Sequence, residues 1–191
     1  MPSAPRPVSS VSQLKALTHP LRVRILYAVQ AEGAATASRI GQLVDESPAS
    51  VSYHLRKLAD AGFVQEAPDR GTDGRERWWR VPDGGFTWSS GDFDATPEGR
   101  TTDRAARRLL VDNQFRRRQE FDSDPDRWGA DWVQGAFSTD YVLRMTAEQL
   151  EGMSREIQSV IEKWRVRAES AAAPADSSHV MVFAHGFPFE P

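Results

Sequence analysis

The sequence predicts a mainly α-helical fold with a small amount of β-structure, which is the α+β class. Apolar residues recur at helical spacing over several segments. Short runs of aromatic and β-branched residues, separated by Gly, Pro and Asp, indicate strands in the middle and near the end of the chain. Hydrophobic residues make up 39% of the 191 residues and charged residues 27%, which are the proportions of an ordinary globular protein.

The composition excludes several kinds of site. The chain has no cysteine, which excludes disulfides, thiolate metal sites and cysteine nucleophiles. No stretch approaches the roughly 18 apolar residues that a membrane span needs, and the opening residues lack the apolar core of a signal peptide. We therefore expect a cytoplasmic protein without membrane contact. Residues 1–9, rich in Pro and Ser, are expected to form a disordered arm.

Two helices are predicted before residue 34. Ser10 or Ser12 can cap the first, which runs to about Leu17. The second begins at Pro20, because proline suits the first position of a helix, and it ends at Gly33. Its apolar stripe consists of Leu21, Ile25, Leu26 and Val29.

A short helix, a tight turn and a longer helix follow. Thr36 can cap the short helix over 37–44, and Ser47 can cap the longer one over 48–61. The inward side chains of the short helix are expected to be Ile40, Leu43 and Val44. The apolar face of the longer helix consists of Val51, Leu55 and Leu58. Its opposite face carries small, polar and basic residues, namely Ala49, Ser50, Tyr53, Arg56, Lys57 and Asp60.

A β-hairpin is predicted directly after the longer helix. Residues 63–66 form a short strand, the Pro-, Gly- and Asp-rich segment 68–74 forms the turn, and residues 75–81 form the return strand. Of the two adjacent tryptophans on the return strand, Trp78 is expected to face the core.

The remainder of the chain is predicted to form a separate α/β extension, residues 91–191, after a first domain of residues 10–90. A long helix is expected over about 102–121, and strands over 138–145 and 179–184. Between these strands, Thr146 and Gln149 have the spacing of a capping box. The helix that they begin has a long apolar stripe, formed by Leu150, Met153, Ile157, Val160, Ile161, Trp164 and Ala168.

Helix, turn, helix and hairpin, in this order, are the parts of a winged helix-turn-helix. A DNA major groove about 12 Å wide admits one α-helix, which must present polar side chains outward and apolar ones toward its supporting helices. The helix 48–61 meets this requirement, and the wing 66–80 could reach the backbone or the minor groove. The residues expected to contact DNA are Ser47, Ala49, Ser50, Ser52, Tyr53, Arg56, Lys57, Arg70, Arg75 and Arg77.

The charge distribution agrees with this placement. The net charge of the chain is −3, but residues 1–90 hold 11 basic and 9 acidic residues, whereas residues 91–191 hold 13 and 18. The basic excess therefore lies in the part that is expected to meet DNA. Ser52 could contact a phosphate or only solvent, and His54 is expected on the packed side of its helix, in a hydrogen-bonded structural role.

The motifs THPLRVRIL at 18–26, SVSYHLRKL at 50–58 and AGFV at 61–64 resemble those of the ArsR-type winged-helix regulators. The resemblance covers about residues 12–81. It implies a homodimer that binds a palindromic double-stranded DNA operator with helix 48–61 in the major groove, and that acts as a repressor released by an effector. Metal-sensing members carry a cysteine pair where this chain has residues 38–43, so we expect neither a metal nor a cofactor.

Two alternatives remain open at this point. The aromatic residues Trp128, Trp132, Trp164 and Phe183 could line a pocket for a small-molecule effector, or they could form a second core or a dimer interface. The winged helix could also be a protein-interaction module without specific DNA binding. No grouping of catalytic side chains stands out, so we do not expect an enzyme.

Overall fold

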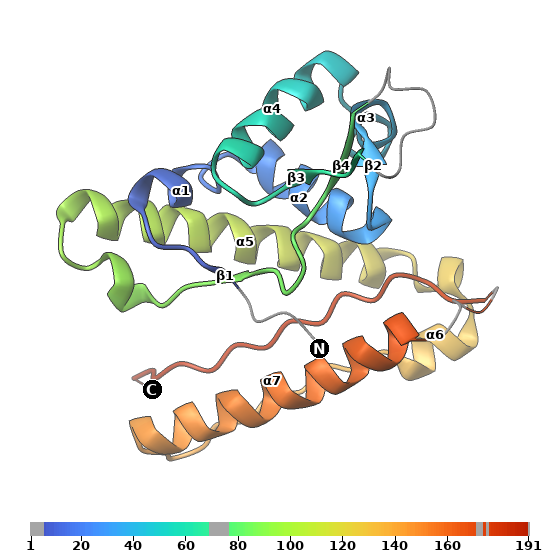
Figure 1. The fold of residues 1–191 in the computed structure, drawn as a ribbon. Coiled ribbons are helices and arrows are strands. Elements are labelled where there is room, and N and C mark those ends of the chain that lie inside the picture. Colours follow the sequence, from blue (N-terminus) through green and yellow to red (C-terminus); the bar gives the residue numbers. More distant parts are fainter. Residues whose placement is uncertain (1–5, 69–76, 171–173, 175, 191) are drawn as a thin grey trace. The chain divides into compact units, whose positions relative to one another are not determined.

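The computed structural model describes residues 6–68, 77–170, 174 and 176–190 (Figure 1). The chain divides into two compact units, residues 1–120 and residues 121–191. We had expected the division near residue 90. It lies later because most of the long helix predicted over 102–121 belongs to the first unit.

The first unit begins with four helices in the predicted order. They are α1 (Val11–Lys15), α2 (Pro20–Glu32), α3 (Ala37–Val44) and α4 (Pro48–Asp60). Each starts at a side-chain cap, because the first N–H groups of a helix have no partner within it. The caps are Ser10, His19, Thr36 and Ser47, each of which accepts a hydrogen bond from a backbone N–H of the first turn.

The predicted hairpin is present but shorter than expected. Strand β3 (Gln65–Glu66) pairs antiparallel with β4 (Trp78–Arg80), and β4 also pairs antiparallel with β2 (Ala35–Thr36). We did not predict β2, because two residues are too few to show an alternating pattern. In β4, Trp79 is buried and Trp78 is half-buried. The expectation that Trp78 faces the core is therefore wrong.

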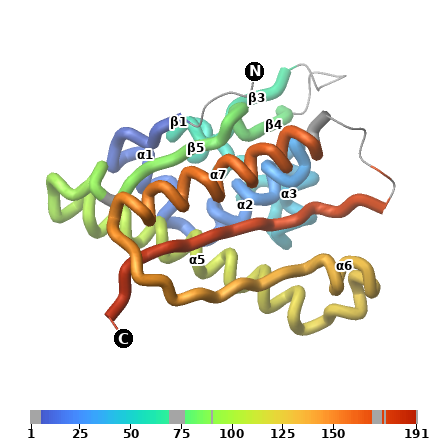
Figure 2. The backbone as a smooth tube through the Cα atoms, turned by 90° about the horizontal axis from the view of Figure 1, so that it is seen from below, coloured from blue at the N-terminus to red at the C-terminus, as the bar shows by residue number. Residues whose placement is uncertain are grey.

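Residues 6–9 are ordered, unlike the arm that we predicted over 1–9; residues 1–5 lie outside the described chain. Strand β1 (Arg6–Pro7) runs parallel to β5 (Phe86–Thr87), as Figure 2 shows. Backbone N–H groups of Arg6 and Val8 donate to Gly85 and Thr87 at 3.0 and 2.9 Å. Val8 is buried in the core, and its burial offsets part of the entropy lost when this segment becomes ordered.

The core of the first unit is formed by the apolar stripes of the four helices with Phe63, Val64 and Trp79. Ile40 and Val44 of α3 are buried as expected, but Leu43 is 42% exposed. The third inward position of α3 is instead Gly41. Its missing side chain matters for the turn that follows.

Helix α5 (Pro97–Ser123) follows a short 3-10 turn, η2 (Ser90–Phe93). It starts five residues earlier than predicted, where the Thr96 hydroxyl accepts the Gly99 N–H at 3.0 Å. Ala106 is fully buried, and the Asp103 carboxylate accepts a hydrogen bond from the Trp88 indole at 2.8 Å. These contacts join α5 to the segment that follows β5.

The second unit contains η3 (Pro125–Trp128), α6 (Ala130–Gly135) and α7 (Ala147–Ser170). The capping box at the start of α7 is confirmed, because Gln149 N–H donates to the Thr146 hydroxyl at 3.2 Å and Thr146 N–H donates to the Gln149 side chain at 2.8 Å. The two strands predicted over 138–145 and 179–184 are not formed. Both segments are extended, but a strand also requires a hydrogen-bonding neighbour, and neither has one among the described residues.

Candidate nucleic-acid interface

Helix α4 has two chemically different faces. Val51, Leu55 and Leu58 are fully buried, and the helix packs on α2 and α3. Figure 1 shows α4 on the side of the first unit that lies away from α5. The predicted apolar face is therefore confirmed.

The turn between α3 and α4 depends on a residue that the sequence analysis did not single out. A Cβ atom on Gly41 would lie 2.6 Å from the backbone oxygen of Glu46, closer than real contacts allow. The Glu46 N–H also donates to the Gly41 carbonyl at 3.0 Å, and Asp45 adopts a left-handed conformation with φ 52°. Glycine at position 41 thus permits the close approach that sets where α4 begins. Its only signal in the sequence is a glycine in an otherwise amphipathic helix.

The outward face of α4 carries the side chains that we expected there. Tyr53 is 56% exposed, and Arg56 and Lys57 are also exposed. Nearer the start of the helix, Ser47 and Ala49 are exposed, whereas Ser50 and Ser52 are half-buried. The Ser47 hydroxyl is occupied as a cap, since it accepts the Ser50 N–H at 3.2 Å.

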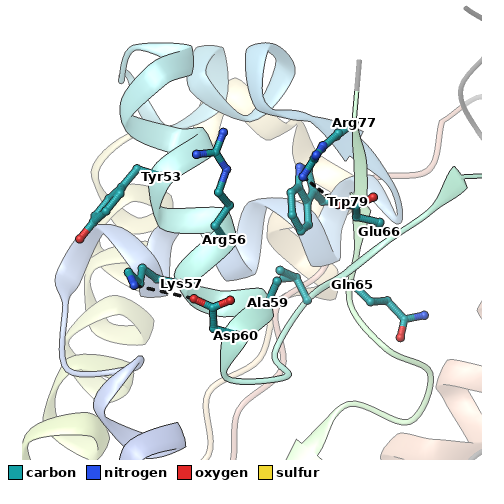
Figure 3. Close-up of a pocket in the computed structure, with 10 residues that line it drawn as sticks. Tyr53, Arg56, Lys57, Ala59, Asp60, Gln65, Glu66, Arg77 and Trp79 are labelled. Atoms are coloured by element: carbon teal, nitrogen blue, oxygen red, sulfur yellow. Dashed lines mark hydrogen bonds and ion pairs between the residues drawn. The ribbon is translucent and has the colours of Figure 1, made fainter. Parts of the chain in front are cut away.

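Tyr53, Arg56 and Lys57 line an open hollow of about 630 Å³ together with Arg77 and Trp79 of the hairpin (Figure 3). We call it the α4–β4 hollow. The structure therefore brings one of the three predicted wing arginines to the same surface as the helix. Arg70 and Arg75 lie outside the described residues.

The cations around the α4–β4 hollow differ in how they are paired. Lys57 lies 3.7 Å from the Asp60 carboxylate, and Arg77 lies 3.1 Å from Glu66. Arg56 forms no ion pair with any described residue, and its guanidinium donates only a long hydrogen bond of 3.4 Å to the Ser52 hydroxyl. Exposed ion pairs contribute about 0–1 kcal/mol, so phosphate could replace these carboxylates at little cost. Arg56 has no such carboxylate partner for a phosphate to replace.

Two histidine rings pack together where the start of α2 meets α4; His19 caps α2, and His54 belongs to α4. The rings of His19 and His54 lie 4.6 Å apart, and the His54 ring also meets the edge of Tyr53. Burial, with Arg22 nearby, lowers the pKa of both histidines; His19 further lowers the pKa of His54, and Glu46 partly opposes this. His54 is on the packed side as predicted, but its buried Nδ1 has no hydrogen-bond partner among the described residues.

Residues 17–66 match the family model described as a helix-turn-helix domain. The match spans α2, α3 and α4 and ends in β3, so it contains the turn and the exposed helix face described above. No curated protein matches the chain in sequence.

Solved structures with some similarity include two of ZitR from Lactococcus lactis and one of RV1404 from Mycobacterium tuberculosis. A ZitR double mutant in its apo form has 16% identity and a TM-score of 0.31, over 78% of this chain and 83% of that chain. RV1404 has 14% identity and a TM-score of 0.31 over 80% of each chain. Wild-type ZitR in complex with DNA has 16% identity and a TM-score of 0.27, over 76% of this chain and 74% of that chain. Similarity at these TM-scores establishes neither a shared fold nor a shared partner.

The aromatic residues expected to line an effector pocket are all exposed in the second unit. The exposed fractions are 39% for Trp128, 36% for Trp132, 63% for Trp164 and 38% for Phe183. An effector pocket at these residues therefore stays a prediction.

In the described part of the chain, no group of three or more metal-ligating side chains lies together. None of the described helices is both long and apolar enough to cross a membrane.

Proposed function

We propose that the chain is a DNA-binding transcriptional regulator that inserts α4 into the major groove. One observation carries this proposal. Tyr53, Arg56 and Lys57 are exposed along one face of α4, while the opposite face is fully buried. A helix that reads DNA must combine these two properties, because its base-contacting side chains cannot also hold it on the domain.

The electrostatics of this surface support a phosphate-rich partner. Arg56 forms no ion pair with any described residue, and the ion pairs of Lys57 and Arg77 are exposed to solvent. The exposed start of α4 adds the positive end of a helix dipole. The wing is proposed to contact the backbone or the minor groove through Arg70, Arg75 and Arg77.

The finer features follow from the resemblance to ArsR-type regulators. The protein would act in the cytoplasm as a homodimeric repressor on a palindromic operator, with residues 91–191 serving dimerisation and binding of an effector. The absence of cysteine separates it from members that sense metals through thiolates.

Salt-dependent binding tests the role of α4. Binding of a fluorescein-labelled duplex of the chain's own promoter region is measured by anisotropy over a range of salt concentrations. The plot of log K against log salt has a negative slope, and loss of one phosphate contact makes this slope less steep by about 0.9. We expect such a loss for Arg56→Ala or Lys57→Ala with unchanged folding. Arg108→Ala is the matched control, since this arginine is 84% exposed on α5. Wild-type affinity and slope in both α4 variants would exclude α4 as the recognition helix.

The second candidate is a protein-interaction module. Asp60 and Glu66 on the rim of the α4–β4 hollow favour it, because carboxylates repel phosphates. It predicts that no duplex is retained even at low salt, and that Arg56→Ala changes nothing in the DNA assay. Retention that weakens steeply with salt excludes it.

A further inference from the structure

The described residues of the second unit form no core of their own. No described residue of 121–191 is buried, and most of the exposed large apolar side chains of the described chain belong to this unit. On α7 they include Val160, Ile161 and Trp164, and beyond α7 they include Val180 and Val182. So many exposed large apolar side chains on one unit are typical of an interaction surface.

Two segments of the unit have the chemistry of strands without the pairing of strands. Residues 138–145 and 179–184 are extended, and no described residue of either makes a backbone hydrogen bond. Their side chains are rich in aromatic and β-branched types, as in Tyr141-Val142-Leu143 and Val180-Met181-Val182-Phe183. Unpaired extended backbone of this composition is a template for another strand.

The topology of the unit suggests where the missing strands lie. Figures 1 and 2 show both segments running along α7, each in the direction opposite to the helix. The two segments are therefore parallel to each other, and α7 connects them as the helix of a βαβ unit. The two segments share no backbone hydrogen bond. A further strand between them would make this arrangement a split βαβ unit.

The charged side chains indicate which of the two segments can pair with the same segment of a second chain. Residues 180–184 carry no charged side chain, so two copies can lie side by side without repulsion. Residues 138–145 carry Asp140 and Arg144, which suit an outer strand, because charged side chains protect an exposed edge from further pairing.

We propose that a second copy of this chain supplies the missing strand. The 179–184 segments of the two copies pair antiparallel about a two-fold axis, and each also pairs antiparallel with the 138–145 segment of the other copy. The resulting four-stranded sheet has the 179–184 segments in its centre and the 138–145 segments at its edges. A two-fold interface of this kind closes on itself, and one face of the sheet covers the apolar stripe of α7. This inference deepens the homodimer of the proposed function by naming its surface.

Cysteine cross-linking tests the central strand pair. The chain has no cysteine, so a single introduced cysteine can form a disulfide only between two copies. In a series from Val180→Cys to Phe183→Cys, we expect covalent dimers under mild oxidation, with the highest yield at the position nearest the two-fold axis. Glu151→Cys, an exposed position on α7, is the control and should stay monomeric under denaturing electrophoresis. Absence of a cross-link throughout the series overturns the proposal.

The oligomeric state gives a second, independent test. Val182→Pro removes a ladder N–H from a central strand and should raise the dissociation constant of the dimer by about tenfold or more in sedimentation experiments. Ser178→Pro, just before the strand, should leave the dimer intact. A wild-type monomer, or a dimer unchanged in Val182→Pro, overturns the strand pairing but leaves the DNA-binding role of α4 standing. Conversely, wild-type DNA binding by the Arg56→Ala and Lys57→Ala variants overturns that role and leaves the strand pairing standing.

Discussion

Asp103 joins α5 to the segment after β5 through a buried carboxylate. Its side chain is 7% exposed. It accepts hydrogen bonds from the Trp88 indole at 2.8 Å and from Arg107 Nε at 2.9 and 3.1 Å. The Arg107 guanidinium also lies over the Trp88 ring, 5.3 Å from its centre. Replacement of Asp103 by alanine therefore removes the shared acceptor of two side chains.

The expected cost of Asp103→Ala follows from what each partner loses. The half-buried Trp88 N–H is left without an acceptor, which costs about 1–3 kcal/mol. The Arg107 side chain is 40% exposed and regains water, so its share is under about 1 kcal/mol. We expect a loss of about 2–3 kcal/mol in the free energy of unfolding. Asp103→Asn keeps an acceptor oxygen for Trp88 and should cost less.

Urea unfolding followed by far-UV circular dichroism measures this loss. A double-mutant cycle with Trp88→Phe isolates the indole hydrogen bond, because phenylalanine has no N–H to leave unpaired. In the Trp88→Phe background, Asp103→Ala should cost about 1–3 kcal/mol less than in the wild type. A cost of Asp103→Ala below about 0.5 kcal/mol, or additive effects in the cycle, would refute the role assigned to this carboxylate.

Three further predictions concern α4 and its supports. Gly41→Ala should cost about 1–3 kcal/mol in urea unfolding because its Cβ would meet a backbone oxygen at 2.6 Å, whereas Gly152→Ala, with open space at its Cβ, should not destabilise. Ser47→Ala should cost about 1 kcal/mol through loss of the helix cap; unchanged stability would contradict this role of the hydroxyl. The pKa values of His19 and His54 are lowered in the folded protein, so the unfolded chain binds protons more readily than the folded one as pH falls through their ordinary value of 6.5. The free energy of unfolding should therefore decrease as the pH falls through this range. His54→Gln should reduce this decrease between pH 7.5 and 5, and an identical pH dependence in the variant would contradict it.

Local interactions explain why the helices of the first unit could be predicted. Ser10, Thr36 and Ser47 each cap a helix within three residues of themselves, and Gly33 ends one through a positive φ of 69°. These signals act over a few residues and are visible in any linear sequence. The buried face of α4 followed in the same way from its spacing of four and three residues.

Long-range pairing could not be predicted from such signals. Strand β2 has only two residues, and β1 is ordered by a partner, β5, that lies about 80 residues away in the sequence. The burial of Trp79 rather than Trp78 depends on how β4 pairs, and one residue of register exchanges the two faces of a strand. The segments 138–145 and 179–184 have the composition of strands but are unpaired in the single chain.

The amino-acid sequence alone determined where the first four helices begin, which face of α4 is apolar, and that thiolate chemistry is absent. Each of these depends on residues close together in the chain or on composition. Only the tertiary structure decided that Arg56 and Arg77 line one hollow, that the turn requires Gly41, and that no described residue of the second unit is buried. Those features arise between residues brought together by folding, where distance in space, rather than distance along the chain, sets the energy of contact.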